Sequence, residues 1–378
     1  MNILVDIRLL GRGGLSGIHE YTRQIVSHLL ELDTKNHYQL FHNSWHKNPL
    51  PETWTRKENV AAINWNIPNR ILDAGARFFN SPKIDKLVNA DLVFSPHFNI
   101  LATRDKPRLI TIHDLSFLHH PYFFSGRQKL WQWFQNLPKQ IRQAEGIIAD
   151  SEFTKADIVK IFKLPPEKIS VIYPGVDQKF KKLDREDSRL EDFKNRCELN
   201  FPFLLYLGTL EPRKNIPAVI RAFSALKTQK QFNDLKLIIA GRPGWLYKEI
   251  LRTAACSPAK NDIIFWGPVK SEDKIFLYNL AEVFVYPSFF EGFGFPPLEA
   301  QKCGTPVVVA DRTSLPEIMN KSALMVNPWR VGDLTEVLET LLTQSKLRGE
   351  LIRKGFKNAE RFNWQTTAKE ILKLFHHV

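Results

Sequence analysis

Cysteine is scarce in this chain, and long apolar runs are missing. Only three cysteines occur among 378 residues, and no two of them form a Cys-x-x-Cys pair. These numbers argue against a disulfide framework or a zinc site and favour a reducing compartment. No segment reaches the roughly 18 consecutive apolar residues that a transmembrane helix needs. The first residues follow a strand pattern and not that of a signal peptide. We therefore expect a cytoplasmic protein, with peripheral contact to the inner face of a membrane left open.

Negative charge is the scarcer of the two signs. The chain carries 53 Lys and Arg against 40 Asp and Glu, a formal net charge of +13, and both halves are basic. This excess favours anionic partners such as nucleotides, phosphates or an acidic membrane surface. The charge forms no basic arm and no nucleic-acid-binding motif is present, so we expect no nucleic acid as a partner.

Short apolar runs alternate with helical patterns along the whole chain. In the first half the predicted strands are 2–7, 92–94, 109–112, 146–149 and 169–173. The predicted helices between them are 17–30, 127–144 and 152–162. In the second half the predicted strands are 203–207, 235–240, 263–265, 283–286 and 306–309. The predicted helices there are 215–227, 245–255, 272–281 and 297–303. This alternation is typical of parallel sheets with crossover helices.

The length exceeds the roughly 250–300 residues at which single cores stop growing, so two domains are expected. A charged stretch at 179–196 separates the halves. We predict a first domain over residues 1–178, a linker over 179–200 and a second domain over 201–363. Ligands of two such sheets bind at the carboxyl ends of the strands, which predicts a shared cleft.

Two glutamates bracket the segment Glu291-Gly-Phe-Gly-Phe-Pro-Pro-Leu-Glu299, which follows a predicted strand. Its glycines let backbone amides approach a ligand, and its prolines suit a first helical turn, which puts Glu299 early in a helix. A helix start attracts phosphate, but two carboxylates there would compete with it. They are better suited to accept hydrogen bonds from sugar diols. The structural alternative is helix capping by Glu299 and a solvated Glu291.

A basic pair follows the first predicted strand of the second half, in Gly208-Thr-Leu-Glu-Pro-Arg213-Lys214-Asn215. Arg and Lys at such a position can hold a diphosphate. Fixed cations there stabilise charge that builds on a leaving phosphate in the transition state. The chain has no Asp-x-Asp, so these cations are expected to replace a divalent metal. We expect no metal site and no cofactor.

Three other segments admit both structural and functional interpretations. The glycine-rich loop 11–17 fits a phosphate cradle or a tight turn. His113 ends a predicted strand, where it could contact substrate, although a lone histidine is more often structural. Aromatic and basic residues interleave over 117–142, which suits a membrane interface, an acceptor groove or an amphipathic helix with buried rings. The same domain holds Trp65, Arg70, Arg77, Phe78 and Phe79.

Together these motifs resemble the retaining, GT-B-fold glycosyltransferases of family 4, which include many bacterial mannosyltransferases. The resemblance runs from Gly14 to Trp364. It rests on Tyr286-Pro-Ser288, the Glu291 to Glu299 motif, Cys303-Gly-Thr-Pro306, Ser314-Leu-Pro-Glu317, the segment 208–215, His113-Asp114 and Ala149-Asp-Ser151-Glu-Phe-Thr-Lys. It implies two doubly wound Rossmann-like domains facing across a cleft. It also implies that the C-terminal helix, 364–378, crosses back onto the first domain.

The resemblance also implies roles for matching positions. Arg213 and Lys214 would bind the donor diphosphate, and Glu299 the ribose. Glu291 would bind the donor sugar, and His113 would lie beside that sugar. The other implied donor-binding positions are Gly13, Gly14, Gly208, Val269, Gly292, Phe293, Gly294 and Phe295.

The implied reaction is metal-independent, retaining transfer of a sugar to a glycan or lipid-linked acceptor in surface polysaccharide biosynthesis. GDP-mannose is favoured as donor, ahead of UDP-sugars and dTDP-sugars, because segment 208–215 looks like that of mannosyltransferases. The chain departs from the family at Asn320-Lys-Ser-Ala323, which leaves the donor open, and at His19-Glu20, which leaves the acceptor open.

Two other functions compete with glycosyl transfer. A sugar-nucleotide epimerase shares the architecture, but the combination of Glu291, Glu299, Arg213 and Lys214 points away from it. A non-enzymatic module that binds carbohydrate or nucleic acid is disfavoured by the distributed charge.

Overall fold

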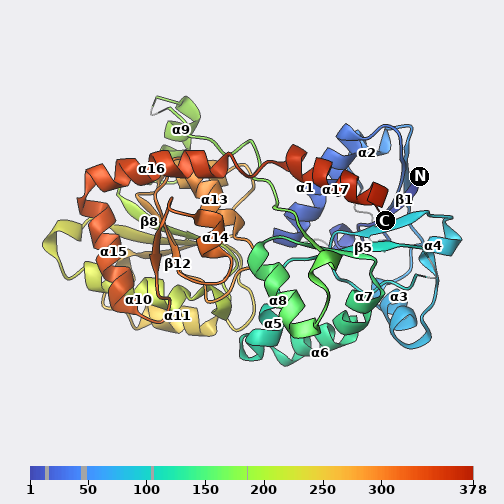
Figure 1. The fold of residues 1–378 in the computed structure, drawn as a ribbon. Helices are drawn as coiled ribbons and strands as arrows, with labels where there is room; N and C mark the ends of the chain where they lie inside the picture. The colour runs from blue at the N-terminus through green and yellow to red at the C-terminus, as the bar shows by residue number, and fades with distance from the viewer. Residues whose placement is uncertain (13–16, 44–48, 104–105, 185, 378) are drawn as a thin grey trace. The chain divides into compact units, whose positions relative to one another are not determined.

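The computed structural model describes residues 1–12, 17–43, 49–103, 106–184 and 186–377. The chain divides into two compact units (Figure 1). Unit 1 comprises residues 1–119, 126–175 and 363–378, and unit 2 comprises residues 120–125 and 176–362. The chain therefore passes between the units at 119–120, 125–126, 175–176 and 362–363.

Unit 1 is built on a seven-stranded sheet in the order β3-β2-β1-β4-β5-β6-β7, and every pair of neighbours is parallel. Its strands are β1 (Asn2–Asp6), β2 (His37–Phe41), β3 (Val60–Ile63), β4 (Leu92–Ser95), β5 (Arg108–Ile112), β6 (Gly146–Ala149) and β7 (Ile169–Val171). The strand order reverses between β1 and β4. In sheets of this kind the ligand binds beyond the carboxyl ends of the strands at that point.

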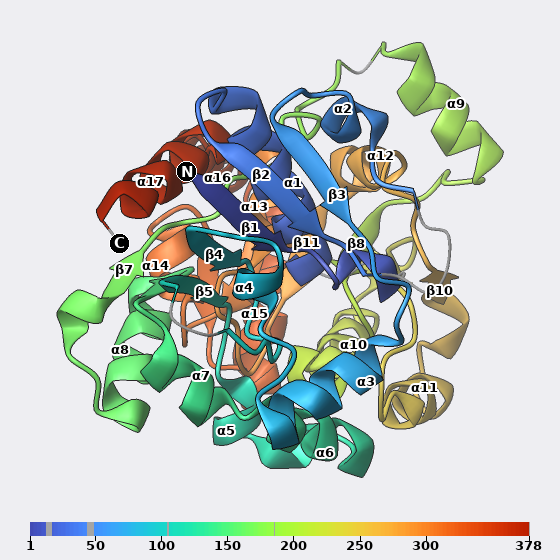
Figure 2. The same cartoon turned by 90° about the vertical axis from the view of Figure 1, so that its right-hand side faces the viewer.

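The helices of unit 1 connect these parallel strands. They are α1 (Gly17–Leu32), α2 (Glu52–Thr55), α3 (Asn69–Ala74), α4 (Ile84–Leu87), α5 (Ser116–His119), α6 (Gly126–Gln135), α7 (Leu137–Gln143), α8 (Glu152–Phe162) and α17 (Trp364–His377). Short turns are η1 (Leu10–Arg12), the π-helical η2 (Gly75–Phe79) and η4 (Pro166–Lys168). Figure 2 shows the helices around the sheet.

Unit 2 is built on a six-stranded parallel sheet in the order β10-β9-β8-β11-β12-β13. Its strands are β8 (Phe203–Leu207), β9 (Lys236–Ala240), β10 (Ile263–Gly267), β11 (Val283–Tyr286), β12 (Val307–Ala310) and β13 (Leu324–Val326). Here the order reverses between β8 and β11. Both units are therefore doubly wound α/β domains, which confirms the predicted fold class.

The helices of unit 2 follow the same plan. They are α9 (Ser188–Arg196), α10 (Ile216–Leu226), α11 (Lys248–Ala255), α12 (Lys274–Leu280), α13 (Phe295–Lys302), α14 (Leu315–Met319), α15 (Val331–Thr343) and α16 (Ser345–Ala359). Short turns are η3 (Pro121–Phe123), η5 (Pro212–Lys214), η6 (Lys230–Phe232) and η7 (Lys260–Asp262).

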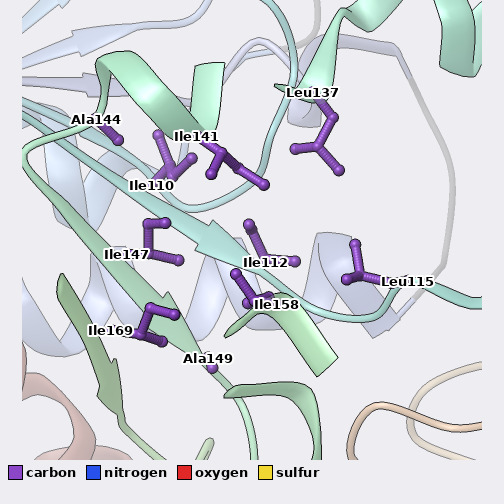
Figure 3. Close-up of a cluster of buried hydrophobic side chains, with 10 residues drawn as sticks. All are labelled: Ile110, Ile112, Leu115, Leu137, Ile141, Ala144, Ile147, Ala149, Ile158 and Ile169. Atoms are coloured by element: carbon purple, nitrogen blue, oxygen red, sulfur yellow. The ribbon is translucent and has the colours of Figure 1, made fainter. Parts of the chain in front are cut away.

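A cluster of branched aliphatic side chains fixes the carboxyl end of β5 (Figure 3). It joins strands β5, β6 and β7 to helices α7 and α8 through Ile110, Ile112, Leu115, Leu137, Ile141, Ala144, Ile147, Ala149, Ile158 and Ile169. All five residues of β5 are buried, as expected for a parallel strand covered on both faces. This packing sets the position of His113, which directly follows β5.

The predicted helix over 127–144 is wrong as one element, because the structure divides it into α6 and α7. Asn136 adopts the left-handed conformation with φ 49°, and Pro138 lies in the first turn of α7. A proline has no backbone N–H and is best tolerated in a first turn, so the helix restarts there.

Residues 179–200, predicted as a linker, belong to unit 2. Helix α9 packs through Phe193, which is 2% exposed and stacks on Phe276 and Trp266 at centroid distances of 5.0 and 6.1 Å. The C-terminal helix α17 lies in unit 1, where Trp364 contacts Tyr21 of α1 edge to face at 5.7 Å.

A short segment from the first half of the chain, residues 120–125, belongs to unit 2. The indole Nε1 of Trp245 donates to the carbonyl of Phe123 at 2.6 Å. Phe124 stacks on Trp245 at 5.6 Å, and Phe123 stacks on Phe289 at 5.5 Å.

Among the described residues, no helix is long and apolar enough to cross a membrane.

Candidate functional site

The charged side chains predicted in unit 2 meet where the strand order reverses. Arg213 and Lys214 lie in the turn after β8, and Glu291 lies in the loop after β11. The carboxylate of Glu291 bridges them, with Oε2 3.0 Å from Nη1 of Arg213 and Oε1 2.6 Å from Nζ of Lys214. Segments 77 and 78 residues apart in the sequence thus form one ion cluster.

Further contacts hold each cation of this cluster. Arg213 lies 2.8 Å from Oε1 of Glu211 and donates through Nη1 to the carbonyl of Phe290 at 2.7 Å. The Nζ of Lys214 also donates to the hydroxyl of Tyr286 at 2.6 Å. The two cations, Arg213 and Lys214, therefore compensate the charges of two carboxylates. Further contacts fix the geometry of each cation. Such a cluster is preorganised, because it need not rearrange when charge develops beside it.

Burial and charge act in opposite directions on these groups. Burial raises the pKa of Glu291, but the charges of Arg213 and Lys214 outweigh it and lower that pKa to about 2. Burial and the neighbouring Arg213 lower the pKa of Lys214, against the raising effect of Glu291. Glu291 is therefore an anion at neutral pH. Each of its oxygens has a second lone pair, which leaves it able to accept a hydrogen bond from a ligand hydroxyl.

The glycine-rich loop after Glu291 is fixed by its own hydrogen bonds. The hydroxyl of Ser314 donates to the carbonyls of Glu291 and Phe293 at 2.9 and 3.2 Å. Gly294 has φ 107° at the start of α13, and a Cβ there would come 2.9 Å from Leu315. The loop 292–295 therefore needs glycine at this position, and it leads directly into the helix that carries Glu299.

Glu299 lies on α13, as its sequence position predicts, and is 6% exposed. Its Oε2 accepts a hydrogen bond from the hydroxyl of Tyr278 at 2.8 Å and lies 3.9 Å from Nζ of Lys274. Both contacts are made by Oε2, so the buried carboxylate keeps lone pairs for a ligand diol.

Gly208 and Val269 lie at the carboxyl ends of β8 and β10. Gly208 donates its amide to Ala240 at 2.9 Å, and its carbonyl would lie 1.9 Å from a Cβ on Gly241. Gly241 also has a φ of 141°, which residues with side chains rarely adopt. Both the backbone conformation and the missing space for a Cβ therefore require glycine at this position. Val269 is half-buried in the turn after β10.

In unit 1, His113 follows β5 with both ring nitrogens engaged. Nδ1 donates to the carboxylate of Asp150 at 2.6 Å, and Nε2 donates to the carbonyl of Pro96 at 3.0 Å. Burial lowers the pKa of His113, but the charge of Asp150 raises it overall. The imidazole is therefore held in place, and it would have to break a contact to bind a substrate through a nitrogen. Gly13 and Gly14 lie outside the described residues.

Sequence reasoning missed several partners of these side chains. Glu211 lies in the segment 208–215 that contains the basic pair, and Asp150 lies in the Ala149-Asp-Ser151 motif. Their positions in these motifs could have marked both carboxylates as site residues. Nothing in the sequence singled out Tyr278.

Within the described parts of the chain, no group of three or more His, Cys, Asp or Glu side chains could hold a metal ion.

Comparison with known proteins identifies the family of the chain. Residues 15–180 match the model for Glycosyltransferase Family 4, and residues 187–358 match that for Glycosyl transferases group 1. The O-antigen chain mannosyltransferase B of Escherichia coli is 25% identical over 371 residues, 96% of each chain. The serotype-specific mannosyltransferase WbdA of Escherichia coli is 31% identical over 257 residues, which is 68% of this chain. The chain spans about a third of WbdA, 32% of its length.

Among solved structures, HepE of Anabaena in complex with UDP-glucose covers all of both chains with a TM-score of 0.75 and 18% identity. This likeness concerns the fold, and it agrees with the expected GT-B arrangement of two Rossmann-like domains. The two family matches together cover nearly the whole chain. The chain therefore belongs to the glycosyltransferases, with a Family 4 domain in its first half and a group 1 domain in its second.

Proposed function

We propose that this chain transfers a sugar from a nucleotide-sugar donor to a glycan or lipid-linked acceptor in the synthesis of a surface polysaccharide. The observation that carries the proposal is the buried cluster of Arg213, Lys214 and Glu291 where the strand order of unit 2 reverses. Cations and a carboxylate side by side suit a ligand with a diphosphate at one end and sugar hydroxyls at the other.

In this proposal the bond between the anomeric carbon and the diphosphate oxygen breaks. The bonding electron pair goes to the diphosphate, and Arg213 and Lys214 stabilise the added negative charge. Glu291 accepts hydrogen bonds from donor-sugar hydroxyls, and Glu299 accepts them from the ribose. The acceptor oxygen bonds to the anomeric carbon on the same face of the sugar and gives its proton to the departing diphosphate oxygen. The two cations supply the charge that a divalent metal supplies in other enzymes, so no metal is required.

The proposed donor is GDP-mannose, and mannose is the sugar that is transferred. Two relatives are named as mannosyltransferases, which favours mannose, whereas the HepE complex holds UDP-glucose and keeps the uridine nucleotide as the alternative. The finer choice of nucleotide depends on the turn at Val269, which the resemblance assigns to the base.

A thermal-shift screen of the full chain with GDP, UDP and dTDP tests the donor site. A ligand that binds the folded state alone stabilises it by about 2.7 kcal/mol at 100 times its Kd. We expect GDP to raise the melting temperature most and Arg213→Ala to reduce that shift. If none of the three nucleotides stabilises the protein, the donor assignment fails. Incubation with GDP-mannose separates the epimerase alternative, which would yield an epimerised sugar and no glycan product.

We also propose that the acceptor is presented at a membrane surface, so that the enzyme acts as a peripheral protein. Support comes from the excess of positive charge and from relatives named for O-antigen chains.

A further inference from the structure

The aromatic and basic residues expected at a membrane divide into three groups in the structure. Trp65 packs against Phe41 at 5.1 Å beside the core of unit 1. Phe123 and Phe124 belong to unit 2 and stack on Phe289 and Trp245. The rings of Trp65, Phe123 and Phe124 are therefore taken up by internal packing. What remains is a set of side chains on α3, η2 and α6 of unit 1, and the ribbons of α3 and α6 lie near one another (Figure 2).

We define the aromatic face as the large apolar side chains of α3, η2 and α6 that are more than half exposed. They are Ile71, Phe78, Phe79, Leu130 and Trp133, with exposed fractions of 61, 62, 80, 63 and 58%. Five such side chains on adjacent helices are unusual for a surface that meets water alone, because apolar patches of this kind mark interaction sites.

The face is part of a folded surface and does not belong to a frayed segment. Leu72 and Ala76 on the opposite side of α3 and η2 are buried at 6 and 5% exposure. Asp73 of α3 forms a buried ion pair with Arg8 at 3.1 Å. Phe78 meets Phe134 of α6 edge to face at 5.8 Å, which joins η2 to α6. The exposed rings are therefore held outward by a fixed framework.

Positive charge surrounds these rings. The guanidinium of Arg77 lies over the Trp133 ring, 4.7 Å from its centroid. Arg70, Arg127 and Lys129 are exposed on the same elements. Within residues 69–79 and 126–135, all of which are described, the one acidic side chain is Asp73, and it is buried. The face thus combines rings that can enter an apolar interface with cations that can meet anionic headgroups.

We propose that the aromatic face docks unit 1 onto an anionic lipid bilayer. This inference rests on the proposed function, in which the acceptor is presented at a membrane. Aromatic rings favour the boundary between headgroups and acyl chains, and neighbouring Lys and Arg side chains contact lipid phosphates. Each cation near such a surface changes the partition coefficient by about fivefold, so two of them account for about 25-fold. Binding of this strength is reversible, as an enzyme that visits a membrane-borne acceptor requires.

The test is co-sedimentation of the full chain with phosphatidylcholine vesicles that contain phosphatidylglycerol, and with phosphatidylcholine vesicles alone. We expect binding to the anionic vesicles that weakens in high salt. Phe78→Ser with Phe79→Ser should weaken it about tenfold or more because two interfacial rings are lost. Arg127→Gln with Lys129→Gln should weaken it about 25-fold. Phe78 and Phe79 belong to the aromatic face, and Arg127 and Lys129 lie on α6 beside it.

The matched control is Leu246→Ser with Leu251→Ser, which removes two exposed apolar side chains of unit 2, 51 and 41% exposed. This variant should bind vesicles as the parent protein does. The proposal is overturned if the parent protein ignores anionic vesicles at low salt, or if the Phe78 and Phe79 variant binds undiminished. It is also overturned if the parent is a dimer that this variant converts to a monomer, because the face would then join two copies.

The thermal shift by GDP separates this inference from the proposed function. Failure of vesicle binding with an intact GDP shift overturns the docking and leaves the donor site standing. If GDP, UDP and dTDP all fail to raise the melting temperature of the parent protein, the donor site itself is overturned.

Discussion

Replacement of Lys214 by methionine tests whether the ion cluster of unit 2 acts in catalysis or in folding alone. The change keeps the length of the side chain and removes its charge. Glu291 then loses the cation 2.6 Å from Oε1 and retains Arg213 at 3.0 Å, and Tyr286 loses the donor to its hydroxyl. The variant therefore leaves a buried carboxylate with half of its charge compensation.

Two separate losses follow from this geometry. Removing one partner of a buried ion pair costs about 3–5 kcal/mol of stability, and we expect about 3 kcal/mol because Arg213 remains. Removing one fixed cation from a site where negative charge develops costs about 3–4 kcal/mol of transition-state stabilisation, a factor of about 10²–10³ in kcat. The first loss is a property of folding, and the second is a property of the reaction.

A double variant, Lys214→Met with Glu291→Gln, separates the two losses. It removes both charges of one pair, so most of the free energy of unfolding should return, because no unpaired buried charge is left. Activity should stay at least 100-fold down, on the order of the loss from one fixed charge. The measurements are urea unfolding and kcat/KM with the nucleotide sugar.

A matched control is Lys227→Met, which breaks the 2.9 Å pair with Asp262 in the same unit. That variant should lose stability and keep its activity. Recovery of activity together with stability in the double variant would refute the catalytic interpretation.

Three further predictions follow from the same structure. Transfer should persist in EDTA if Arg213 and Lys214 take the place of a metal as we propose, and an activity abolished by chelation and restored by Mn²⁺ would contradict this. The folded-state pKa of Glu291 is lowered from 4.5 to about 2. Its contribution to stability is therefore fully present above pH 4.5 and lost as the pH falls toward 2. Acid unfolding followed by circular dichroism should show this loss in the parent protein and not in Glu291→Gln. Gly241→Ala should unfold the protein or lower its melting temperature sharply, because the new Cβ would lie 1.9 Å from the carbonyl of Gly208. Gly267→Ala, with φ 79° and open space around it, should cost only about 1–2 kcal/mol by urea unfolding, and equal losses would contradict the steric argument.

The strands that position the site could be predicted because they are short, apolar and buried on both faces. Strands β8 and β11, with the sequences Phe-Leu-Leu-Tyr-Leu and Val-Phe-Val-Tyr, have every residue buried. Strands β2 and β3 lie toward one edge of the sheet and have exposed or half-buried residues. The pattern of β2, His-Tyr-Gln-Leu-Phe, lacks a continuous apolar run. Strand β3 is apolar but short, and its small residues Ala61 and Ala62 are exposed, so the sequence did not identify it. Strand β13 has only three residues, too few for a recognisable strand pattern.

The predicted charges were found at the carboxyl ends of the predicted strands, but their pairing could not be predicted. The ion pairs of Arg213 and Lys214 with Glu291 depend on the order of β8 and β11 in the sheet, which no local pattern contains. The same holds for His113 and Asp150, which follow neighbouring strands β5 and β6. Local sequence therefore indicated which residues carry charge, and the sheet topology determined which of them meet.

The placement of residues 120–125 has a practical consequence for protein engineering. Chimeras of two-domain enzymes are usually cut at the obvious boundary, which here would be near residue 176. Unit 2 expressed as residues 176–362 alone would leave the rings of Phe289 and Trp245 without Phe123 and Phe124. The first domain of the recipient enzyme would also supply its own segment at the position of residues 120–125. The side chains of that segment would not match the surface formed by Phe289 and Trp245 of this chain. A graft of unit 2 onto another first domain should therefore include residues 120–125, as a six-residue replacement in the first half of the recipient chain.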